Sequence, residues 1–266
     1  MEDQTYRIVA LERGLKVLSA FTADRHSLGS SEVARLTGIP VSTTYRILRT
    51  LEEAEFVEQL ADGNFTPGVA VLKLGFAALQ NDGVVEAARV PLQELHAATG
   101  ETVNLAVLTG AKVMYLIRHR TAHYVIGNIT VGATLPASCT GVGKCLLAYL
   151  PSEELHQVLT TADLQTAGVG PNAHRELNGL IEDLRHTRER GWSIQNEEVA
   201  HGLRAIAAPV RNIDGVVAAV GISVEGARWP VDRLTTELLD PLTAAAQKVS
   251  LRMGYLEGVT PPPTRS

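Results

Sequence analysis

The chain has 266 residues, 45% of them hydrophobic, and a formal net charge of −5. This length and composition can supply a packed core for one long domain or, as we expect, for two, and they exclude general disorder. The acidic, polar start is not a secretory signal, and the longest nearly apolar stretch, residues 216–224, is less than half a membrane span, so we expect a cytoplasmic protein without a membrane partner.

Cysteine and histidine usage argues against disulfides and metals. Cys139 and Cys145 lie six positions apart, and no partner histidine stands at a spacing typical of zinc ligands. We therefore expect two reduced, structural thiols, no metal site and no cofactor.

The first predicted element is a helix over residues 8–21. Its apolar residues recur at helical spacing and would form the back wall of a small domain. They are Ile8, Leu11, Leu15, Leu18 and Phe21.

Residues 29–64 have the layout of a winged helix-turn-helix. Two short helical patterns meet at a turn in which Gly38 stops the first helix and Pro40 presets the first turn of the second. A tight hairpin with Asp62-Gly63 at its tip follows. This combination is typical of domains that read duplex DNA, so we expect double-stranded operator DNA as a partner.

The helix that follows Pro40 has two distinct faces. Its inward stripe consists of Thr44, Ile47, Leu48 and Leu51. On the outward face, arginines can contact phosphates or guanines, and hydroxyl groups can contact phosphates or base edges; the alternative is an ordinary solvated helix face. The candidate DNA-binding residues are Ser42, Thr43, Tyr45, Arg46 and Arg49, with Asn64 at the wing tip.

Positive charge is sparse in this motif. The only charged residues in the segment 33–51 are Arg35, Arg46 and Arg49, and four glutamates crowd residues 52–58. Because affinity for DNA depends largely on phosphate neutralisation, one copy should bind weakly. We therefore expect a dimer or tetramer that grips paired half-sites.

Residues 69–79 show a helical apolar pattern that predicts a connecting helix, which Asn81-Asp82-Gly83 breaks. We expect four parts in the chain: a DNA-binding domain over residues 1–68, a linker helix over 69–83, a second domain over 84–258 and a disordered tail over 259–266.

The second domain mixes helices with strands. Predicted helices cover residues 84–99, 141–150, 152–159 and 174–190, and a last one follows Trp229-Pro230 and restarts or kinks at Asp240-Pro241. Predicted strands cover residues 102–108, 113–118, 192–196, 205–211 and 216–224, with another around 124–129. This order indicates an α+β domain with a largely antiparallel sheet.

Several motifs in this order resemble the IclR family of bacterial transcriptional regulators. They include Ser31-Glu-Val-Ala-Arg-Leu-Thr-Gly-Ile-Pro, Gly141-Val-Gly-Lys-Cys-Leu-Leu-Ala-Tyr-Leu-Pro and Glu197-Glu-Val-Ala-His-Gly-Leu-Arg-Ala. The resemblance implies a winged helix-turn-helix joined by a helix to a GAF-like effector domain, which binds an organic acid or aromatic metabolite. It also implies dimers or tetramers, and it leaves RNA polymerase open as a partner.

The turn before Lys144 is the first candidate effector contact. A phosphate loop would need glycine at Ser138 and serine or threonine at Cys145, so nucleotide binding is not expected. The start of a helix still suits a carboxylate. Because the resembling family lines its pocket with this turn, the candidates are Thr140, Gly141 and Val142; the alternative is that the glycine serves only close helix packing.

Residues 195–205 are the second candidate region. Adjacent Glu197 and Glu198 would point to opposite faces of a strand, so they are not expected to act as a catalytic pair. The resemblance implies ligand contacts at Gln195, Leu203 and Ala205. Family members often carry an acid at the position of Gln195 and a cysteine at the position of Ala205. This chain has neither, which favours a bulkier or less polar effector over small oxo-acids.

Further candidates lie on the predicted strands. Asn104, Tyr115 and Ser223 can face the same cavity, although residues of this kind more often serve simple packing. Arg118, His119 and Arg204 are cations that can neutralise an acid, and Arg118 is included among the effector contacts.

The leading hypothesis is thus an effector-responsive transcription factor without catalytic residues. Two alternatives stay open. One is an enzyme that uses Cys139 or Cys145 as a nucleophile, which would need a nearby base and a lowered thiol pKa. The other is a constitutive architectural DNA-binding protein.

Overall fold

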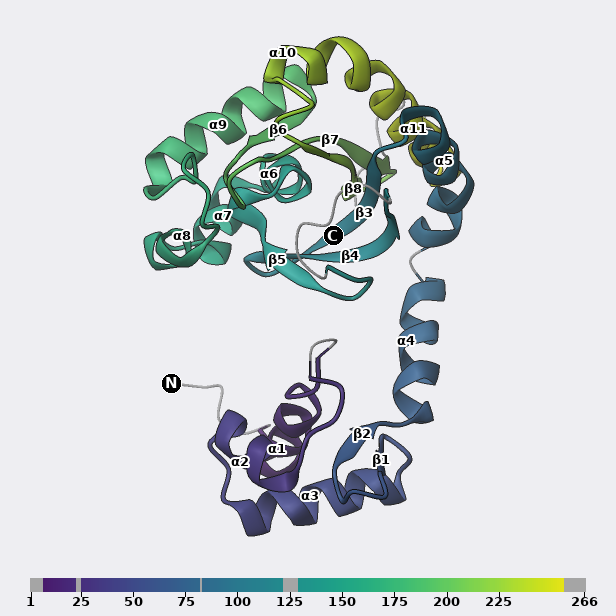
Figure 1. Cartoon of the computed structure of the whole chain (residues 1–266), viewed down its shortest axis with the longest axis vertical. Helices are drawn as coiled ribbons and strands as arrows, with labels where there is room; N and C mark the ends of the chain where they lie inside the picture. Colours follow the sequence, from purple (N-terminus) through teal and green to yellow (C-terminus); the bar gives the residue numbers. More distant parts are fainter. Residues whose placement is uncertain (1–6, 23–24, 82, 122–128, 256–266) are drawn as a thin grey trace, which may run out of the picture. The chain divides into compact units, whose positions relative to one another are not determined.

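The structure, a computed structural model, describes residues 7–22, 25–81, 83–121 and 129–255. The chain forms two compact units, Met1–Asp82 and Gly83–Ser266 (Figure 1). The predicted tail and most of the strand predicted around residues 124–129 lie outside the described residues. None of the described helices is long and apolar enough to cross a membrane.

The first unit is a winged helix-turn-helix followed by a further helix. Its elements are α1 (Val9–Leu18), α2 (Ser30–Thr37), α3 (Val41–Glu53), β1 (Val57–Gln59), β2 (Phe65–Pro67) and α4 (Val69–Asn81) (Figure 1). Gly38, with φ 70°, ends α2 in the left-handed conformation that glycine adopts without strain, and α3 begins directly after Pro40. The two wing strands pair antiparallel. The predicted layout is confirmed.

The core of this unit takes in less of α1 than predicted. Its buried residues are Val17, Ala20, Leu28, Val33, Ile39, Leu48, Val57 and Phe65. Of the predicted α1 stripe, Ile8, Leu11 and Leu15 are 65%, 58% and 55% exposed. The helix packs through its C-terminal end instead, so the prediction that these three residues form a buried back wall is wrong.

The second unit is an α+β domain around one antiparallel sheet, and the predicted fold class is confirmed. The sheet has the strand order β5-β4-β3-β8-β7-β6. Its strands are β3 (Thr102–Thr109), β4 (Lys112–His119), β5 (Thr134–Pro136), β6 (Ser193–Asn196), β7 (Leu203–Asn212) and β8 (Gly215–Glu225). Three long helices, α5 (Val84–Thr99), α9 (Leu177–Arg190) and α11 (Leu239–Arg252), and the short α6 (Gly141–Leu147) lie around it.

The two faces of the sheet differ in side-chain size. Large residues such as Val220 and Ile222 pack with α5 and α11 on one face. Because neighbouring strand residues point to opposite faces, the alternate positions, such as Ala219 and Gly221, face α6. A Cβ on Gly221 would lie 2.7 Å from Val142 Cγ1, so α6 approaches this face closely. Figure 1 shows α5 and α11 side by side, away from α6.

Several predicted helix boundaries need correction. The helix predicted over residues 8–21 is α1 and ends already at Leu18. The helix predicted over residues 174–190 begins only at Leu177. In the segment before it, the Arg175 guanidinium donates to backbone carbonyls of Leu164, Gln165, Ala167 and Gly168. The helix predicted over residues 141–150 ends as α6 at Leu147 and continues as a turn. The helix predicted over residues 152–159 is α7 (Ser152–Val158), and the short α8 (Thr161–Thr166) after it was not predicted.

The C-terminal helix is irregular before its proline, as predicted. A short α10 (Val231–Arg233) runs into a π-helical segment, Leu234–Leu238, and α11 then carries Pro241 in its first turn. Since proline cannot donate a backbone hydrogen bond, a change of helical register just before it is a physically reasonable adjustment.

Candidate functional site

The outward face of α3 has the exposure expected from the sequence. Thr44 and Leu48 are buried, whereas Ser42, Tyr45, Arg46 and Arg49 are exposed, and Thr43 is half-buried. The two arginines differ in their surroundings. Arg49 Nη1 lies 2.6 Å from Glu52 Oε2, while Arg46 has no ion-pair partner among the residues the structure describes.

The wing packs against this helix and is internally braced. The Tyr45 ring meets the buried Phe65 ring edge-on, with centroids 6.4 Å apart. At the tip, Asn64 Nδ2 donates to Asp62 Oδ2 (3.1 Å), and the Asn64 backbone amide donates to Asp62 Oδ1 (3.0 Å). The Asn64 side chain is therefore used to shape the wing tip.

A pocket in the second unit lies between the small-residue face of the sheet and the start of α6. All ten candidate effector contacts line it: Asn104, Tyr115, Arg118, Thr140, Gly141, Val142, Gln195, Leu203, Ala205 and Ser223. Five further lining residues were not predicted: Thr102, Ile129, Leu135, Val199 and Gly221. Thr102 and Gly221 stand two positions from predicted residues on the same strands, so the strand alternation could have indicated them.

Three polar side chains form a continuous row at one end of the pocket. Arg118 Nη1 donates to Asn104 Oδ1 (2.8 Å), and Asn104 Nδ2 donates to Ser223 Oγ (3.1 Å). The register explains this row, because Asn104 on β3 stands opposite Arg118 on β4. Burial lowers the pKa of Arg118, and Arg118 has no carboxylate partner within the described part of the chain. Burial also raises the pKa of Tyr115 to about 12, so its hydroxyl stays protonated.

The turn at the start of α6 is rigid. Thr140 Oγ1 accepts a hydrogen bond from the Gly143 amide (3.1 Å) and so caps the helix. A Cβ on Gly143 would lie 2.2 Å from the carbonyl oxygen of Ala137, so this glycine is required by packing alone. Because α6 has only seven residues and the Thr140 side chain already accepts from the Gly143 amide, this helix start offers little free donor capacity for the expected carboxylate.

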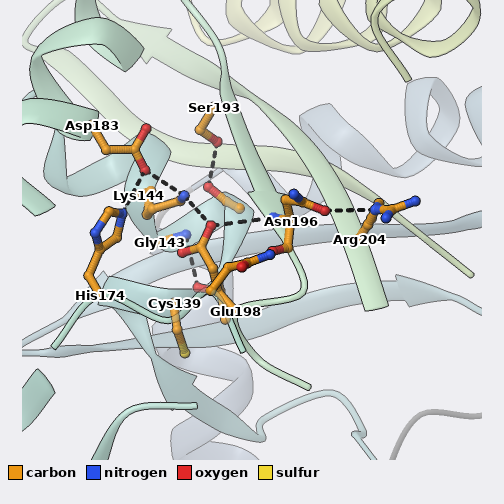
Figure 2. A network of polar contacts seen from close by, with 12 residues as sticks. Cys139, Gly143, Lys144, His174, Asp183, Ser193, Asn196, Glu198 and Arg204 are labelled. Carbon is orange, nitrogen blue, oxygen red and sulfur yellow. Dashed lines mark hydrogen bonds and ion pairs between the residues drawn. The ribbon is translucent and has the colours of Figure 1, made fainter. Parts of the chain in front are cut away.

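Lys144 lies at the centre of a buried ion-pair network on the α6 side of the sheet (Figure 2). The side chain is 1% exposed, and its Nζ lies 2.6 Å from both Asp183 Oδ2 and Glu198 Oε1. Burial by itself raises the pKa of Asp183, but the hydrogen bond from His174 and the charge of Lys144 outweigh it and lower that pKa to about 2. At Glu198 burial prevails, and the pKa is raised.

Three of these side chains also have the chemistry of metal ligands. Ligand atoms of His174, Asp183 and Glu198 lie within 4.8 Å of one another. The Lys144 ammonium already contacts both carboxylates and supplies positive charge between them. The arrangement is therefore an internal ion-pair network that connects α6, α9 and the loop after β6, and the lysine is not available as a phosphate-binding residue.

Glu197 and Glu198 lie in that loop rather than on a strand, which corrects the predicted extended geometry. Glu197 adopts φ 55° and pairs with Arg204 Nη2 (2.8 Å) and His201 Nδ1 (2.9 Å). Arg204 also donates to the Asn196 side chain and to two backbone carbonyls. The two carboxylates thus have separate partners, and Arg204 is a structural cation that does not line the pocket.

Cys139, Cys145 and His119 do not line the pocket. Burial raises the pKa of both Cys139 and Cys145 to about 12, so both stay protonated thiols. His119 stacks on His96 with ring centroids 5.7 Å apart, and burial together with His96 lowers the pKa of His119.

Family models match both units. Residues 10–61 match the IclR helix-turn-helix domain, and residues 76–251 match the C-terminal domain of the bacterial transcriptional regulator IclR. The transcriptional repressor IclR of Escherichia coli K12 is 32% identical over 260 residues, which cover 94% of this chain and 92% of the repressor.

Solved structures show the same fold. An IclR-type transcriptional regulator from Silicibacter superposes with a TM-score of 0.81 at 25% identity, over 95% of this chain and 98% of that chain. An IclR homolog from Microbacterium hydrocarbonoxydans, solved with 4-hydroxybenzoate, gives a TM-score of 0.79 at 23% identity, over 92% of this chain and 98% of that chain. The chain belongs to the IclR family of bacterial transcriptional regulators.

Proposed function

We propose that this regulator binds operator DNA through α3 and that a small organic acid in the pocket changes its operator affinity. The observation that carries the effector assignment is Arg118, a partly buried guanidinium that lines the pocket and has no carboxylate partner within the described part of the chain. A desolvated cation of this kind favours an anionic ligand. The Asn104 and Ser223 side chains beside it can complete the hydrogen bonds of a carboxylate.

The proposed DNA contacts are the exposed side chains of α3. Arg46 is the strongest candidate because its guanidinium is not engaged by a described carboxylate, whereas Arg49 must exchange Glu52 for a phosphate or base. Ser42, Thr43 and Tyr45 offer hydroxyl groups on the same helix. Asn64 contributes by holding the wing tip in shape.

We further propose that the protein acts as a dimer or a higher oligomer. α1 exposes an apolar stripe at helical spacing, Ile8, Leu11 and Leu15, and α4 exposes Leu72 and Leu74. Burying such faces against a second copy removes apolar surface from water and doubles the few arginines available to DNA. Sedimentation velocity on Leu72→Glu should show weaker self-association than the wild type, while Val169→Glu, at an exposed apolar residue of the other unit, should not.

The buried thiols support a binding protein over an enzyme. A nucleophilic cysteine needs a lowered pKa and an accessible sulfur, and both cysteines here are buried with raised pKa values.

The proposed function can be tested with an operator probe obtained by selection. DNA selected from a random duplex library on the full-length protein would serve as this probe in gel retardation. Small carboxylic acids would then be titrated against the complex and against the free protein in a thermal-shift assay. We expect at least one acid to change operator affinity and to raise the unfolding temperature, because a ligand shifts an equilibrium only if it prefers one state. Arg118→Met should abolish both effects.

A further inference from the structure

Three arginines of the second unit lie against two aromatic rings. The guanidinium carbons of Arg188 and Arg211 lie 5.9 and 4.6 Å from the centre of the Tyr149 ring. The guanidinium carbon of Arg190 lies 4.1 Å from the centre of the Trp192 ring. A cation is attracted to the face of an aromatic ring at these distances. We call the five residues the arginine–aromatic patch.

The packing of α6 assembles this patch. Tyr149 stands just beyond the end of α6, and this helix packs against α9, β6 and β7, which carry or adjoin the three arginines. Arg190 and Arg211 both act electrostatically on the buried thiol of Cys145 in α6, so the two ring contacts adjoin each other. None of the five residues lines the pocket, and the patch is therefore a separate surface.

The three guanidinium groups are not neutralised within the described part of the chain. Arg188 and Arg211 make no side-chain hydrogen bond or ion pair there, and Arg190 donates only through Nε, to the Trp192 carbonyl oxygen (2.7 Å). Because like charges repel and burial lowers the pKa of Arg190, this gathering of cations opposes folding unless an anion binds. By contrast, five other arginines of this unit lie within 3.0 Å of a glutamate oxygen: Arg89, Arg185, Arg204, Arg228 and Arg233.

The acids nearest to the patch along the chain have other partners. Glu189 contacts Arg185 and His186. Asp214 accepts from the Asn212 side chain (3.4 Å). The patch thus keeps its positive charge on a chain whose formal net charge is −5.

The residue types in the patch favour a protein partner over nucleic acid. Arginine, tyrosine and tryptophan are enriched at the centres of protein interfaces, where lysine is depleted, and the patch contains no lysine. Ile213, in the hairpin turn that follows Arg211, is 52% exposed and adds an apolar side chain beyond the patch. Strong binding to duplex DNA through charge typically uses about 6–10 phosphate contacts, and three arginines cannot supply them.

We infer that the arginine–aromatic patch docks an acidic segment of a partner protein, whose carboxylates contact the free guanidinium groups and whose apolar side chains cover the rings. A carboxylate matches the planar guanidinium through two parallel hydrogen bonds. In an extended segment, side chains two positions apart lie on the same side and about 6–7 Å from each other, so two acids can reach the two cations that share one ring. The inference is independent of the proposed function, because it needs neither an effector nor an operator.

Peptide arrays probed with the full-length protein would test the inference. One set of peptides carries two glutamates one to four positions apart, with leucine and tryptophan beside them, and a second set has glutamine in place of each glutamate. The protein should bind members of the glutamate set and not their glutamine counterparts. In solution, measured by fluorescence anisotropy, the best glutamate peptide should bind at least about tenfold more tightly than its glutamine counterpart.

Substitutions in the patch would locate the binding. The double variant Arg188→Gln/Arg211→Gln should weaken binding of the best peptide at least about tenfold, and Arg188→Gln alone at least about threefold. The matched control is Arg185→Gln, which removes an exposed arginine of the same helix that is already paired with Glu182 and Glu189. It should weaken binding by less than about twofold. If the double variant does not fold, the exposed Arg188→Gln alone still decides the test.

The outcomes are distinct. The inference is overturned if no peptide binds in preference to its glutamine counterpart, or if Arg188→Gln weakens binding no more than Arg185→Gln does. A duplex of random sequence would be titrated in the same anisotropy assay. If the patch variants lose affinity for this duplex but keep their affinity for the acidic peptide, the patch is a nucleic-acid contact and the inference is overturned as well.

Discussion

Replacing Lys144 with methionine keeps an unbranched side chain of similar size but removes the charge that lies between two acids. In the wild-type protein, Nζ contacts Asp183 and Glu198 at 2.6 Å each and is almost completely buried. In the variant both carboxylates would stay in the interior without their cation. Hydrogen bonds from His174 and from the Asn196 amide would remain but cannot replace a full charge.

The expected cost follows from the burial of the three groups. Breaking a buried ion pair by removing one partner destabilises a protein by about 3–5 kcal/mol. The Asp183 side chain is 22% exposed, so solvent screens part of its charge, and we expect a value near the lower end, about 3 kcal/mol. For a unit of about 180 residues, this corresponds to a fall of roughly 6–12 °C in unfolding temperature.

Differential scanning calorimetry of the full-length protein would measure this change, with Glu198→Gln as the matched control. The glutamine can still accept from Lys144, and Asp183 remains as the charged partner of the lysine, so this variant leaves no buried charge unpaired. The control should therefore lower the unfolding temperature by less than about 3 °C, equivalent to about 1 kcal/mol. If Lys144→Met unfolds within about 2 °C of the wild type, or if the control costs as much as the lysine variant, the buried ammonium does not stabilise the fold in this way.

Three further predictions concern the DNA face, the network and the thiols. Arg46→Ala should weaken retardation of selected operator DNA and lower the salt dependence of binding by about one to two phosphate equivalents for a dimer. The control Arg185→Ala, in the other unit, should change neither quantity. Unchanged retardation by Arg46→Ala would contradict the proposed contact. The folded Asp183 has a pKa of about 2, below its ordinary 3.8, so the stability that its charged form contributes is present above about pH 4 and is lost as the pH falls towards 2. The unfolding temperatures of the wild type and Asp183→Asn should therefore converge over that interval. A difference that stays constant with pH would contradict this contribution of Asp183. Ellman's reagent at pH 8 should label Cys139 and Cys145 only after unfolding, and rapid labelling of either in the native protein would revive the nucleophile hypothesis.

Local periodicity was sufficient to predict most of the fold and the two faces of α3. Thr44 and Leu48 are buried and Arg46 is exposed because a helix repeats every 3.6 residues, and no tertiary information is needed to see this. The same periodicity wrongly predicted that Leu11 and Leu15 are buried in the core. An apolar stripe has the same sequence pattern whether it packs inside its own domain or stays exposed on the surface of that domain. β5 escaped prediction because three residues show no alternation.

The pocket was only partly predictable. Strand alternation and the family resemblance brought Asn104 and Ser223 to the same cavity as Gln195, but neither could show that one amide would be paired and the other free. The network around Lys144 could not be seen in the sequence at all, because its carboxylate partners lie 39 and 54 positions away and their meeting depends on the packing of α6 against the sheet.

The difference in side-chain size between the two faces of the sheet separates the main core from the pocket. The large apolar residues that stabilise the domain face α5 and α11, whereas Ala205, Gly221 and Gln195 face the pocket. A substitution at Ala205 or Gln195 can therefore change the shape and polarity of the pocket while leaving the main core intact. A sheet built in this way lets one scaffold acquire new chemical signals by a few replacements, each of small cost to folding, while the DNA-binding unit stays unchanged.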